Sequence, residues 1–504
     1  MSCIVLTDLR TAQMRATKEY LEAQGYTVRI PPEGCRLWKE DEVRAFAASC
    51  PEDLTGMIHP APPAFQCGLE EATEEQAARA RDEGPLAAWC VTKVFGEIFR
   101  KKGGGTLIYL GSVHAEKPMG YGTLFSAGCG AVQMLNREVN QDYGTSGVRS
   151  YYVQRGPMTG DPDLRNDLTN FFCGMEKRYP ERKVPEDDSL NPLLAFLLTP
   201  AAAPLAGSDL RADGGMSMYY GERQEEEVVG LGRLYRAGEQ EKKDEPSSFR
   251  KPVREDRVAL VTGSGKGVGA GIVRVLCAAG MKCVINCNSN PQMAEKLLEE
   301  IRGTGGEAFV YRADVSDPAQ AMAMVSAAVE RYGRLDVLVN NAAMQYNRFV
   351  DQYDGETISR LWDINFGGYW RMIRAALPEL RKSPNPRIVN IGSVHGKRPT
   401  CFDAGYAMTK GGIRMLTREA AIELQPEGIP VICLNLGGCK IEFKTGLPGF
   451  FNRRPAETLN PEIRHRERLV LPEEVGETVL FLCSETGEAL TGGCIRIDRG
   501  QMLR

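Results

Sequence analysis

The sequence predicts two α/β domains in tandem, each built on a doubly wound parallel sheet. Short apolar strands alternate with helical segments through most of the 504 residues, a charged segment divides the chain, and the two halves share an ungapped repeat. A chain of this length is long for one domain and sufficient for two hydrophobic cores.

The first half begins with a strand, a helix and a second strand, which we expect over Cys3–Leu6, Ala16–Gln24 and Tyr26–Ile30. The alternation continues with a strand that ends over Leu54–Pro60, a helix over Pro85–Arg100, a strand over Thr106–Gly111 and a helix over Ala127–Tyr143. This order is typical of a parallel sheet with helices on both faces.

Residues 222–255 are rich in charge, with Pro and Ser and one brief apolar patch, which indicates a linker. We therefore divide the chain into a first domain over residues 1–216, a linker over 217–254 and a second domain over 255–504. The second domain opens with a strand over Arg257–Thr262, after which the alternation of strands and helices starts again.

The two halves align at an offset of 281 positions without a gap over roughly a hundred residues, which indicates an internal repeat. Equivalent pairs include Ser112 and Ser393, Val113 and Val394, His114 and His395, Trp89 and Trp370, and Gly156 and Gly437. The first half is shorter than the second between its second strand and His59.

Several chemically active positions of the second half have no equivalent in the first. The offset places Phe125 on Tyr406, Cys129 on Lys410 and Gly84 on Asn365. The first strand is followed by residues 8–11, DLRT, so side chains and a carboxylate occupy the place where a pyrophosphate would need bare backbone.

Composition excludes several classes of function. The 62 basic and 66 acidic residues leave a net charge of −4, which argues against nucleic acid as a partner. No apolar run approaches the ~20 residues that span a bilayer, and the N-terminus lacks a secretory signal, so we expect a cytoplasmic protein. The 15 cysteines are scattered without a C-x-x-C motif, which favours reduced thiols and no metal site.

A glycine-rich turn, TGSGKGVG, follows the first strand of the second half and opens a helix. Such a turn lets phosphates approach backbone N–H groups and the helix dipole. A similar spacing also marks plain tight turns, but its position directly after a strand favours a nucleotide site. The expected cofactor-binding residues here are Gly263, Ser264, Lys266, Gly267, Val268 and Gly269.

The second strand of this half, CVINCNSN, ends without the Asp or Glu that would bind a free ribose 2′-hydroxyl. NADP(H) is therefore favoured over NAD(H), with Lys266, Asn288 and Ser289 near the 2′-phosphate, although each is equally consistent with a solvated loop residue. Two further groups follow later strands and are expected to contact the cofactor: Asp314 with Val315, and Asn341 with Ala342.

Tyr406 and Lys410 are four positions apart and would share one face of a helix. An ammonium in that position lowers the pKa of a neighbouring phenol, which would make Tyr406 a proton donor near neutrality.

The ordered set of TGSGKGVG, Asp314, NNAA, Asn365, Ser393, Tyr406-x-x-x-Lys410 and a closing TGG...IDRG resembles the short-chain dehydrogenase/reductase family over residues 257–504. The glycine spacing looks like the branch with bacterial ketoacyl-acyl-carrier-protein reductases and many sugar and steroid dehydrogenases. The resemblance implies that Tyr406 is the general acid in reduction, Lys410 lowers its pKa and holds the nicotinamide ribose, Ser393 polarises the carbonyl and Asn365 supports a water relay.

The sequence also departs from the family pattern. Ala343 replaces the usual glycine of NNAG, Gly437 and Gly438 replace the usual Pro-Gly after the sixth strand, and Glu442 stands near a position where threonine often contacts the carboxamide. Gly438 is still expected to contact the cofactor.

These features predict an NADP(H)-dependent oxidoreductase that interconverts a carbonyl and a secondary alcohol, with the active site in the C-terminal half. The N-terminal half is expected to be structural: family members usually pair through the helices after their fourth and fifth strands, and a degenerate copy would supply that partner within one chain. Two chains would then form a homodimer with four family-like units, a layout similar to that of high-molecular-weight ketoacyl reductases.

Two alternatives remain open. One is an NADP(H)-binding sensor or scaffold with little turnover, although a sensor gains nothing from an aligned proton donor. The other is a separate ligand pocket lined by Phe125 and Cys129, for which the sequence gives no positive signal.

Residues 439–471 are expected to cover the substrate and carry seven basic against four acidic residues. The excess favours either an anionic small-molecule substrate or a solvated mobile lid. His395 and His114 occur two positions after Ser393 and Ser112, in both halves, and this symmetry favours a structural role for them over catalysis.

Overall fold

The computed structural model describes residues 2–62, 67–118, 120, 122–159, 183–214, 216–218, 257–399, 403–441, 469–488 and 490–498. Three sequence predictions concern residues outside these ranges. They are the linker beyond residue 218, the basic segment over residues 442–468 with Glu442, and the closing residues 499–504.

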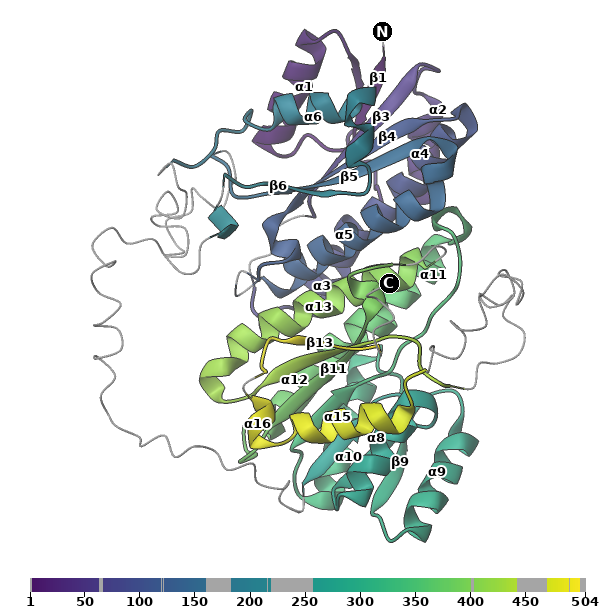
Figure 1. Ribbon diagram of the computed structural model, residues 1–504, viewed down its shortest axis with the longest axis vertical. Helices are drawn as coiled ribbons and strands as arrows, with labels where there is room; N and C mark the ends of the chain where they lie inside the picture. The colour runs from purple at the N-terminus through teal and green to yellow at the C-terminus, as the bar shows by residue number, and fades with distance from the viewer. Residues whose placement is uncertain are drawn as a thin grey trace, which may run out of the picture. The chain divides into compact units, whose positions relative to one another are not determined.

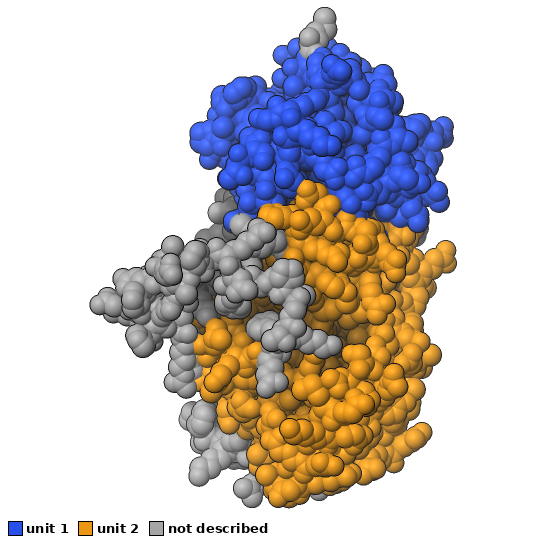
Figure 2. Space-filling model, turned by 90° about the vertical axis from the view of Figure 1, so that its right-hand side faces the viewer, with its two compact units in different colours: residues 1–62, 86–117, 139–250 blue, residues 63–85, 118–138, 251–504 orange. Residues whose placement is uncertain are grey.

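The chain forms two compact units, coloured separately in Figure 2. Unit 1 comprises residues 1–62, 86–117 and 139–250, and unit 2 comprises residues 63–85, 118–138 and 251–504. Two segments of the first half of the sequence therefore belong to the same compact unit as the second half. The domain boundaries expected from the repeat, 1–216 and 255–504, stay a prediction.

Unit 1 is organised around a parallel sheet of six strands in the order β2-β1-β3-β4-β5-β6 (Figure 1). The strands are β1 (Cys3–Leu6), β2 (Thr27–Arg29), β3 (Leu54–Pro60), β4 (Gly105–Ser112), β5 (Val148–Arg155) and β6 (Asp209–Ala212). Two helices, α1 (Ala12–Ala23) and α6 (Asn191–Leu198), bury Met14 and Leu194 in one core with Ile4 and Ile58 of the strands. The helices α2 (Glu40–Ala48) and α4 (Ala87–Lys102) pack against each other.

The first helix begins earlier than the sequence predicted because Thr11 caps it. The Thr11 hydroxyl accepts a hydrogen bond from the Met14 N–H at 3.2 Å, which satisfies a helix donor that has no partner within the helix.

Unit 2 contains a parallel sheet of seven strands in the order β13-β12-β11-β10-β7-β8-β9. The strands are β7 (Val258–Val261), β8 (Lys282–Cys287), β9 (Ala308–Arg312), β10 (Val337–Asn340), β11 (Arg387–Ser393), β12 (Val431–Leu436) and β13 (Cys494–Ile497). The helices are α8 (Gly267–Ala278), α9 (Pro291–Gly303), α10 (Pro318–Tyr332), α11 (Gly355–Trp362), α12 (Gly368–Leu380), α13 (Ala404–Leu424), α15 (Pro472–Leu482) and the short α16 (Glu485–Glu488). Two tandem Rossmann-like sheets confirm the predicted fold class.

The strand order in unit 2 reverses between β7 and β10. β8 and β9 lie on one side of this point, and β10, β11, β12 and β13 lie on the other. Ligands of doubly wound sheets bind in the crevice outside the carboxyl ends of the strands at such a point. The glycine turn after β7 and the NNAA segment at the end of β10 both lie there.

The first half builds a smaller sheet because one strand and one helix are missing from it. Only α2 connects β2 to β3, whereas α9, β9 and α10 connect β8 to β10. This difference accounts for the shorter segment before His59, and it removes the element after which Asp314 occurs in the second half.

Two equivalent helices of the repeat meet within unit 2. Residues 123–138 of α5 (Thr123–Tyr143) lie against α13, and Gly130 faces its repeat counterpart Gly411. A Cβ on Gly130 would lie 2.8 Å from the Gly411 carbonyl oxygen, and a Cβ on Gly411 would lie 2.7 Å from Met134 Cγ. Equivalent residues that contact each other are the mark of a two-fold contact.

Candidate active site

The turn after β7 presents bare backbone at the switch point of the sheet. Gly263 and Gly267 both adopt φ +59°, a conformation that favours glycine. At Gly267 an added Cβ would have, among the described residues, only Ile441 Cγ2 within 4 Å, at 3.6 Å, so their side chains leave this backbone open. Gly267, Val268 and Gly269 form the first turn of α8, whose N–H groups face a phosphate in sites of this kind.

Two residues near the turn serve its structure. The Ser264 side chain is fully buried, and its hydroxyl donates to the Val261 carbonyl oxygen at 2.6 Å. Asn286, near the end of β8, accepts from the Gly263 N–H through its side chain at 2.9 Å and from the Ser264 N–H through its carbonyl at 2.8 Å. The exposed Lys266 caps α8 and is the cation nearest this turn in sequence.

The NNAA segment is tied directly to the same turn. The Asn341 side chain donates to the carbonyl oxygens of Thr262 and Gly263 at 2.9 and 3.0 Å, and the Ala342 N–H donates to the Thr262 hydroxyl at 3.0 Å. A Cβ on Gly269 would lie 2.6 Å from Asn341 Nδ2, so the third glycine permits this close packing. The geometry fits a pyrophosphate on the exposed side of the turn.

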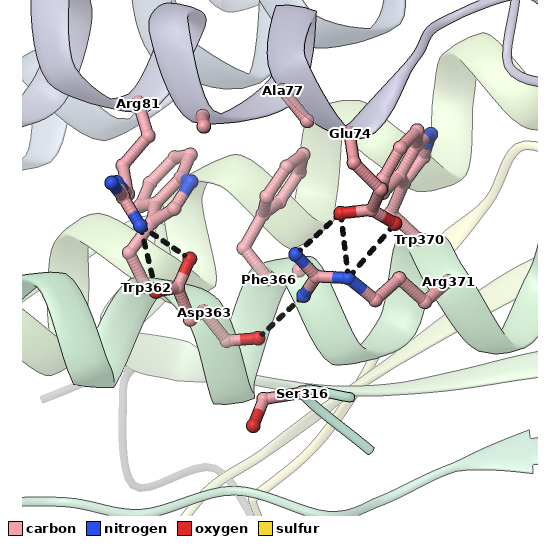
Figure 3. A pocket seen from close by; sticks show the side chains of 11 residues that line it. Glu74, Ala77, Arg81, Ser316, Trp362, Asp363, Phe366, Trp370 and Arg371 are labelled. Carbon is pink, nitrogen blue, oxygen red and sulfur yellow. Dashed lines mark hydrogen bonds and ion pairs between the residues drawn. The ribbon is translucent and has the colours of Figure 1, made fainter. Parts of the chain in front are cut away.

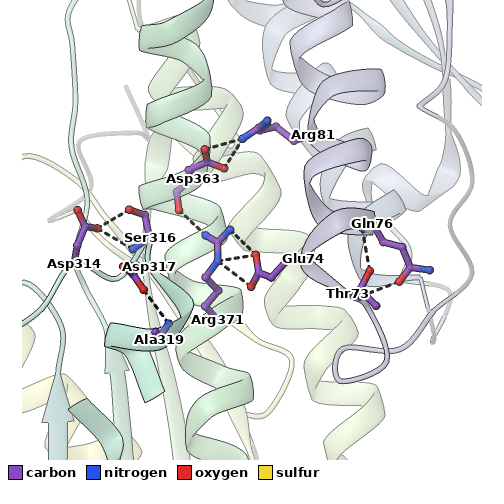
Figure 4. Close-up of polar contacts among 10 residues, drawn as sticks. All are labelled: Thr73, Glu74, Gln76, Arg81, Asp314, Ser316, Asp317, Ala319, Asp363 and Arg371. Atoms are coloured by element: carbon purple, nitrogen blue, oxygen red, sulfur yellow. Dashed lines mark hydrogen bonds and ion pairs between the residues drawn. The ribbon is translucent and has the colours of Figure 1, made fainter. Parts of the chain in front are cut away.

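The ends of β8 and β9 carry the predicted adenosine contacts. The exposed Asn288 donates to Asp314 Oδ2 at 2.8 Å, and Asp314 Oδ1 accepts from the Ser316 hydroxyl at 2.6 Å (Figure 4). Ser289 is exposed beside Asn288, while Val315 is buried. Arg312, which the sequence reasoning did not select, ends β9 opposite Cys287 and donates to the Asn288 carbonyl oxygen at 3.0 Å. The only sequence signal for Arg312 is its place at the end of a strand.

Asn365 is fully buried in a π-helix, η9 (Asp363–Gly367), between α11 and α12. Its Oδ1 accepts from the Met344 N–H at 2.8 Å, and its Nδ2 donates to the Met344 carbonyl at 2.9 Å and to the Thr409 hydroxyl at 3.1 Å. The Asn365 amide therefore joins the segment after β10 to α13, which carries Tyr406.

Ser393, Tyr406 and Lys410 converge beside this segment. Ser393 ends β11, and its hydroxyl makes a side-chain hydrogen bond with Tyr406. Lys410 follows Tyr406 by one turn of α13, and its Nζ lies 5.4 Å from the centroid of the Tyr406 ring. Lys410 Nζ donates to the Ile391 carbonyl oxygen at 2.8 Å.

The proton affinities of these groups follow from burial. Burial raises the pKa of Tyr406 above its usual value, the Asp403 carboxylate raises it further, and the hydrogen bond with Ser393 lowers it. This differs from the expectation that Lys410 brings the phenol close to neutrality, because burial dominates. Burial also lowers the pKa of Lys410, to about 8.

A histidine and a carboxylate lie beside the same group. The Nδ1 atom of His395 is hydrogen-bonded to the carboxylate of Asp403, which is buried one residue before α13 begins. The His395 ring lies edge-on to the Tyr406 ring, with 6.0 Å between centroids. Cys401 and Phe402, which precede Asp403, lie outside the described residues.

The remaining predicted cofactor residue, Gly438, follows β12. Its carbonyl oxygen accepts from the Val470 N–H at 3.0 Å, where the chain returns toward α15. Gly438 therefore holds the two ends of the segment expected over the substrate.

The first half has different chemistry at the equivalent turn. Asp8 Oδ1 accepts from the Arg10 N–H at 2.7 Å, and Asp8 Oδ2 accepts from Arg10 Nε at 2.5 Å. The Asp8 carboxylate thus accepts a hydrogen bond from a backbone N–H of the kind that would otherwise bind a phosphate. Phe125 and Cys129 are buried where the second half has Tyr406 and Lys410.

A cavity of about 310 Å³ lies beside the π-helix, between α3 (Glu74–Arg81) and α12 (Figure 3). Aromatic residues Trp362, Phe366 and Trp370 form part of its lining. Its charged residues are paired: Arg81 Nη1 lies 2.7 Å from Asp363 Oδ2, and Arg371 Nη2 lies 2.7 Å from Glu74 Oε2. These pairs join a segment of the first half to the elements that carry Asn365 (Figure 4).

None of the helices in the described residues has the length and apolar character needed to cross a bilayer. No group of three or more His, Cys, Asp or Glu side chains within the same ranges is arranged to hold a metal ion.

Both halves match models of known families. Residues 257–448 match a model described as short chain dehydrogenase, and residues 3–217 match one described as Enoyl-(Acyl carrier protein) reductase.

Three curated proteins illustrate the similarity. Oxidoreductase UcpA of Escherichia coli is 34% identical over 252 residues, covering 49% of this chain and 95% of that protein. The 2,5-dichloro-2,5-cyclohexadiene-1,4-diol dehydrogenase LinX of Sphingobium indicum is 32% identical over 251 residues, with coverages of 48% and 95%. The 3-oxoacyl-(acyl-carrier-protein) reductase FabG of Staphylococcus aureus is 29% identical over 252 residues, with coverages of 49% and 98%.

Solved structures with sequence similarity include two bacterial enzymes. A dehydrogenase/reductase from Sinorhizobium meliloti 1021 is 26% identical with a TM-score of 0.43, covering 48% of this chain and 94% of that one. A short-chain dehydrogenase/reductase from Serratia marcescens BCRC 10948 is also 26% identical, with a TM-score of 0.44 and coverages of 50% and 99%.

Proposed function

Because this chain belongs to the short-chain dehydrogenase/reductase family, and is thus a carbonyl/alcohol oxidoreductase, we propose that it reduces or forms a carbonyl with NADP(H) at one active site in its C-terminal half. The observation that carries the proposal is the convergence of Ser393, Tyr406 and Lys410 at the end of β11 and the start of α13. Phe125 and Cys129 occupy the equivalent positions of the first half and have no comparable proton chemistry.

In the direction of reduction, the carbonyl oxygen gathers negative charge and requires donors that are already in place. The hydroxyls of Ser393 and Tyr406 are proposed to supply them, and Tyr406 transfers its proton to the oxygen. Such a transfer contributes about 10² to 10⁴-fold to the rate. The raised pKa of Tyr406 keeps the phenol protonated, as an acid requires. The bound nicotinamide cofactor supplies or receives the hydride.

Lys410 and Asn365 support this exchange in different ways. Lys410 Nζ is buried beside the Tyr406 ring, and its pKa of about 8 suits the release of a proton near neutrality. Both ends of the Asn365 amide are engaged by Met344 and Thr409, so we assign it the role of holding the cofactor-side segment against α13.

The residues that would hold the cofactor are Gly263, Gly267, Val268 and Gly269 at the pyrophosphate and Asp314, Val315, Asn341 and Ala342 farther along the same edge. The segment after β8 carries no acidic residue, and the exposed Lys266, Asn288 and Ser289 lie at that end of the sheet with Arg312. A 2′-phosphate would meet cations and hydrogen-bond donors there, which supports NADP(H) over NAD(H).

We assign the first half a structural role, as an internal partner for the second. Three contacts between repeat-related helices support this role: Gly130 faces Gly411, Arg414 Nη2 donates to Gln133 Oε1 at 2.7 Å, and Glu138 accepts from the Asp403 N–H at 2.6 Å. The contact of Gly130 with Gly411 and the contact of Gln133 with Arg414 each join positions that are equivalent in the repeat. Two chains are proposed to associate into a homodimer with two active sites.

The test is oxidation of NADPH and of NADH by the full chain with a panel of ketones, sugars and acyl thioesters. The wild-type protein is expected to turn over at least one ketone with a preference for NADPH, and Tyr406→Phe to reduce kcat at least 10²-fold. Cys129→Ser, at the position equivalent to Lys410, is the matched control and is expected to retain activity. Turnover that survives Tyr406→Phe would refute the assignment of the acid.

A further inference from the structure

His395 lies within the group of proposed catalytic side chains but is not needed for the proton transfer described above. Its N–H donates to the Ser393 hydroxyl at 3.2 Å, and its ring lies edge-on to the Tyr406 ring. The His395 side chain is 22% exposed, so part of the imidazole remains accessible beside the Tyr406 ring.

The orientation of this imidazole is fixed by a buried carboxylate. Asp403 is 2% exposed, and its carboxylate is bonded to His395 Nδ1 and accepts from Gln345 Nε2 at 3.2 Å. The Asp403 N–H donates to Glu138 Oε1 at 2.6 Å, so Glu138, a residue of the first half, holds the backbone of Asp403 in place. An ionised carboxylate accepts only, which places the Nδ1 hydrogen of His395 between the two residues.

The first half keeps the histidine without this arrangement. His114 Nδ1 is bonded to the Lys117 carbonyl oxygen at 2.9 Å, and the repeat counterpart of Asp403 is Gly122. The carboxylate therefore occurs only where the Ser393 and Tyr406 pair also occurs. This correlation argues against the purely structural role that the symmetry of the two histidines favoured.

The chemistry of the remaining ring nitrogen follows from this tautomer. When a neutral imidazole donates from Nδ1, its Nε2 carries a lone pair and acts only as an acceptor. Ser393 and Tyr406 offer donors to the reacting oxygen. The site thus presents one acceptor beside two donors, a pattern that matches a substrate with a hydroxyl close to its carbonyl.

Building on the proposed function, we propose that His395 accepts a hydrogen bond from a substrate hydroxyl near the reacting carbon, and that the preferred substrates are hydroxylated ketones and the corresponding vicinal diols. Asp403 is the positioning residue that keeps His395 Nε2 in the acceptor form. A substrate whose substituent only accepts hydrogen bonds leaves the Nε2 lone pair without a partner, which disfavours that substrate.

The experiment compares three matched ketones with NADPH: cyclohexanone, 2-hydroxycyclohexanone and 2-methoxycyclohexanone. The wild-type protein is expected to favour the hydroxyketone by about tenfold in kcat/KM over each of the others, the ratio that one hydrogen bond supplies. His395→Leu removes the acceptor and is expected to abolish that preference, so that the kcat/KM values of the three ketones become similar.

Asp403→Asn provides a nearly isosteric second test. The Asn side-chain oxygen keeps the bond from Gln345, and its amide donates to His395 Nδ1, which moves the ring hydrogen to Nε2. Because Nε2 then donates, and the hydroxyl and the methoxy oxygen can both accept, we expect the hydroxyketone to lose its advantage over the methoxyketone. A variant that merely loosened the structure would lower all three rates together and would keep their ratios.

His114→Leu is the matched control at the repeat counterpart and is expected to leave all three ratios unchanged. The inference is overturned if the wild-type protein shows no preference for the hydroxyketone, or if the preference for the hydroxyketone over the methoxyketone persists in both His395→Leu and Asp403→Asn. Either result leaves the function itself intact, because that function is tested separately by Tyr406→Phe.

Discussion

Arg81 bridges two carboxylates that are equivalent in the internal repeat. Its Nη1 lies 2.7 Å from Asp363 Oδ2, and its Nε lies 2.8 Å from Asp82 Oδ1. Asp363 and Asp82 begin the two π-helices of the chain's described part that occur at the same place in each half, and the one over Asp363–Gly367 carries Asn365. One cation therefore neutralises a pair of like charges and holds the start of the π-helix that carries Asn365.

We predict a measurable coupling between Arg81 and Asp363. The two side chains are 19% and 33% exposed, so solvent screens the pair only in part, and a coupling of about 1 kcal/mol is expected. Urea unfolding of wild type, Arg81→Met, Asp363→Asn and the double variant measures it. The neighbouring i,i+4 pair of Arg79 and Glu83, 59% and 13% exposed, serves as the control, with about 0.3 kcal/mol expected. Equal couplings in the two cycles would contradict the assignment.

Gly269→Ala is predicted to weaken cofactor binding about tenfold, because the new Cβ would lie 2.6 Å from Asn341 Nδ2 and 2.7 Å from Ser264 Cα. Asn341 and the turn must separate, which moves the backbone donors. Quenching of protein fluorescence by NADPH measures the affinity. Gly303→Ala, where nothing lies within 4 Å of the new Cβ, is the control and should bind as wild type does. Unchanged affinity in Gly269→Ala would show that the turn does not hold the cofactor.

The stability of the first half is predicted to fall in mild acid because of His59. This imidazole is buried with Nδ1 bonded to the Thr7 hydroxyl at 2.8 Å, and burial lowers its pKa to about 4. The unfolded chain, with a pKa near 6.5, binds the proton first as pH falls, so stability present above pH 6.5 is lost progressively down to pH 4.

Between pH 7 and pH 5 this linkage amounts to about 2 kcal/mol. Urea unfolding at both pH values, followed for wild type and His59→Asn, measures it. The wild-type protein should lose about 2 kcal/mol more than the variant over this interval. Parallel losses in the two proteins would mean that His59 is protonated equally in the folded and unfolded states.

The sequence predicted the fold well because its strongest signals are local. Strands such as Thr106–Gly111 are short apolar runs next to breaks, and the observed strand, Gly105–Ser112, differs by one residue at each end. The repeat offset allowed the elements of one half to be placed by reference to the equivalent elements of the other half. The sequence analysis contains no prediction for helices α2 and α3, in which about half of the residues are charged. The predicted start of α1 is later than the observed one because Thr11 caps the helix.

The candidate site could be predicted only where its residues belong to ordered motifs. Ser393, Tyr406 and Lys410 are such residues, and the structure brings them together. The contacts of Arg81 with Asp363 and of Glu138 with Asp403 join positions more than 260 residues apart, for which one sequence contains no signal. The pKa of Tyr406 was misjudged because spacing along a helix reveals the nearest charge but not the extent of burial.

The contact of Gly130 with Gly411 also has a consequence for how the chain can evolve. In a homodimer, one mutation changes the same residue on both sides of the two-fold axis. An Arg–Asp pair on one side of the axis must therefore also occur on the other side. Fusion of the two copies removes this requirement. Arg81 and its counterpart Trp362 have already diverged, while Gly130 and Gly411 remain the same because the helix backbones leave no room for a side chain at either position. A residue of the first half can therefore change without a matching change at its counterpart in the second.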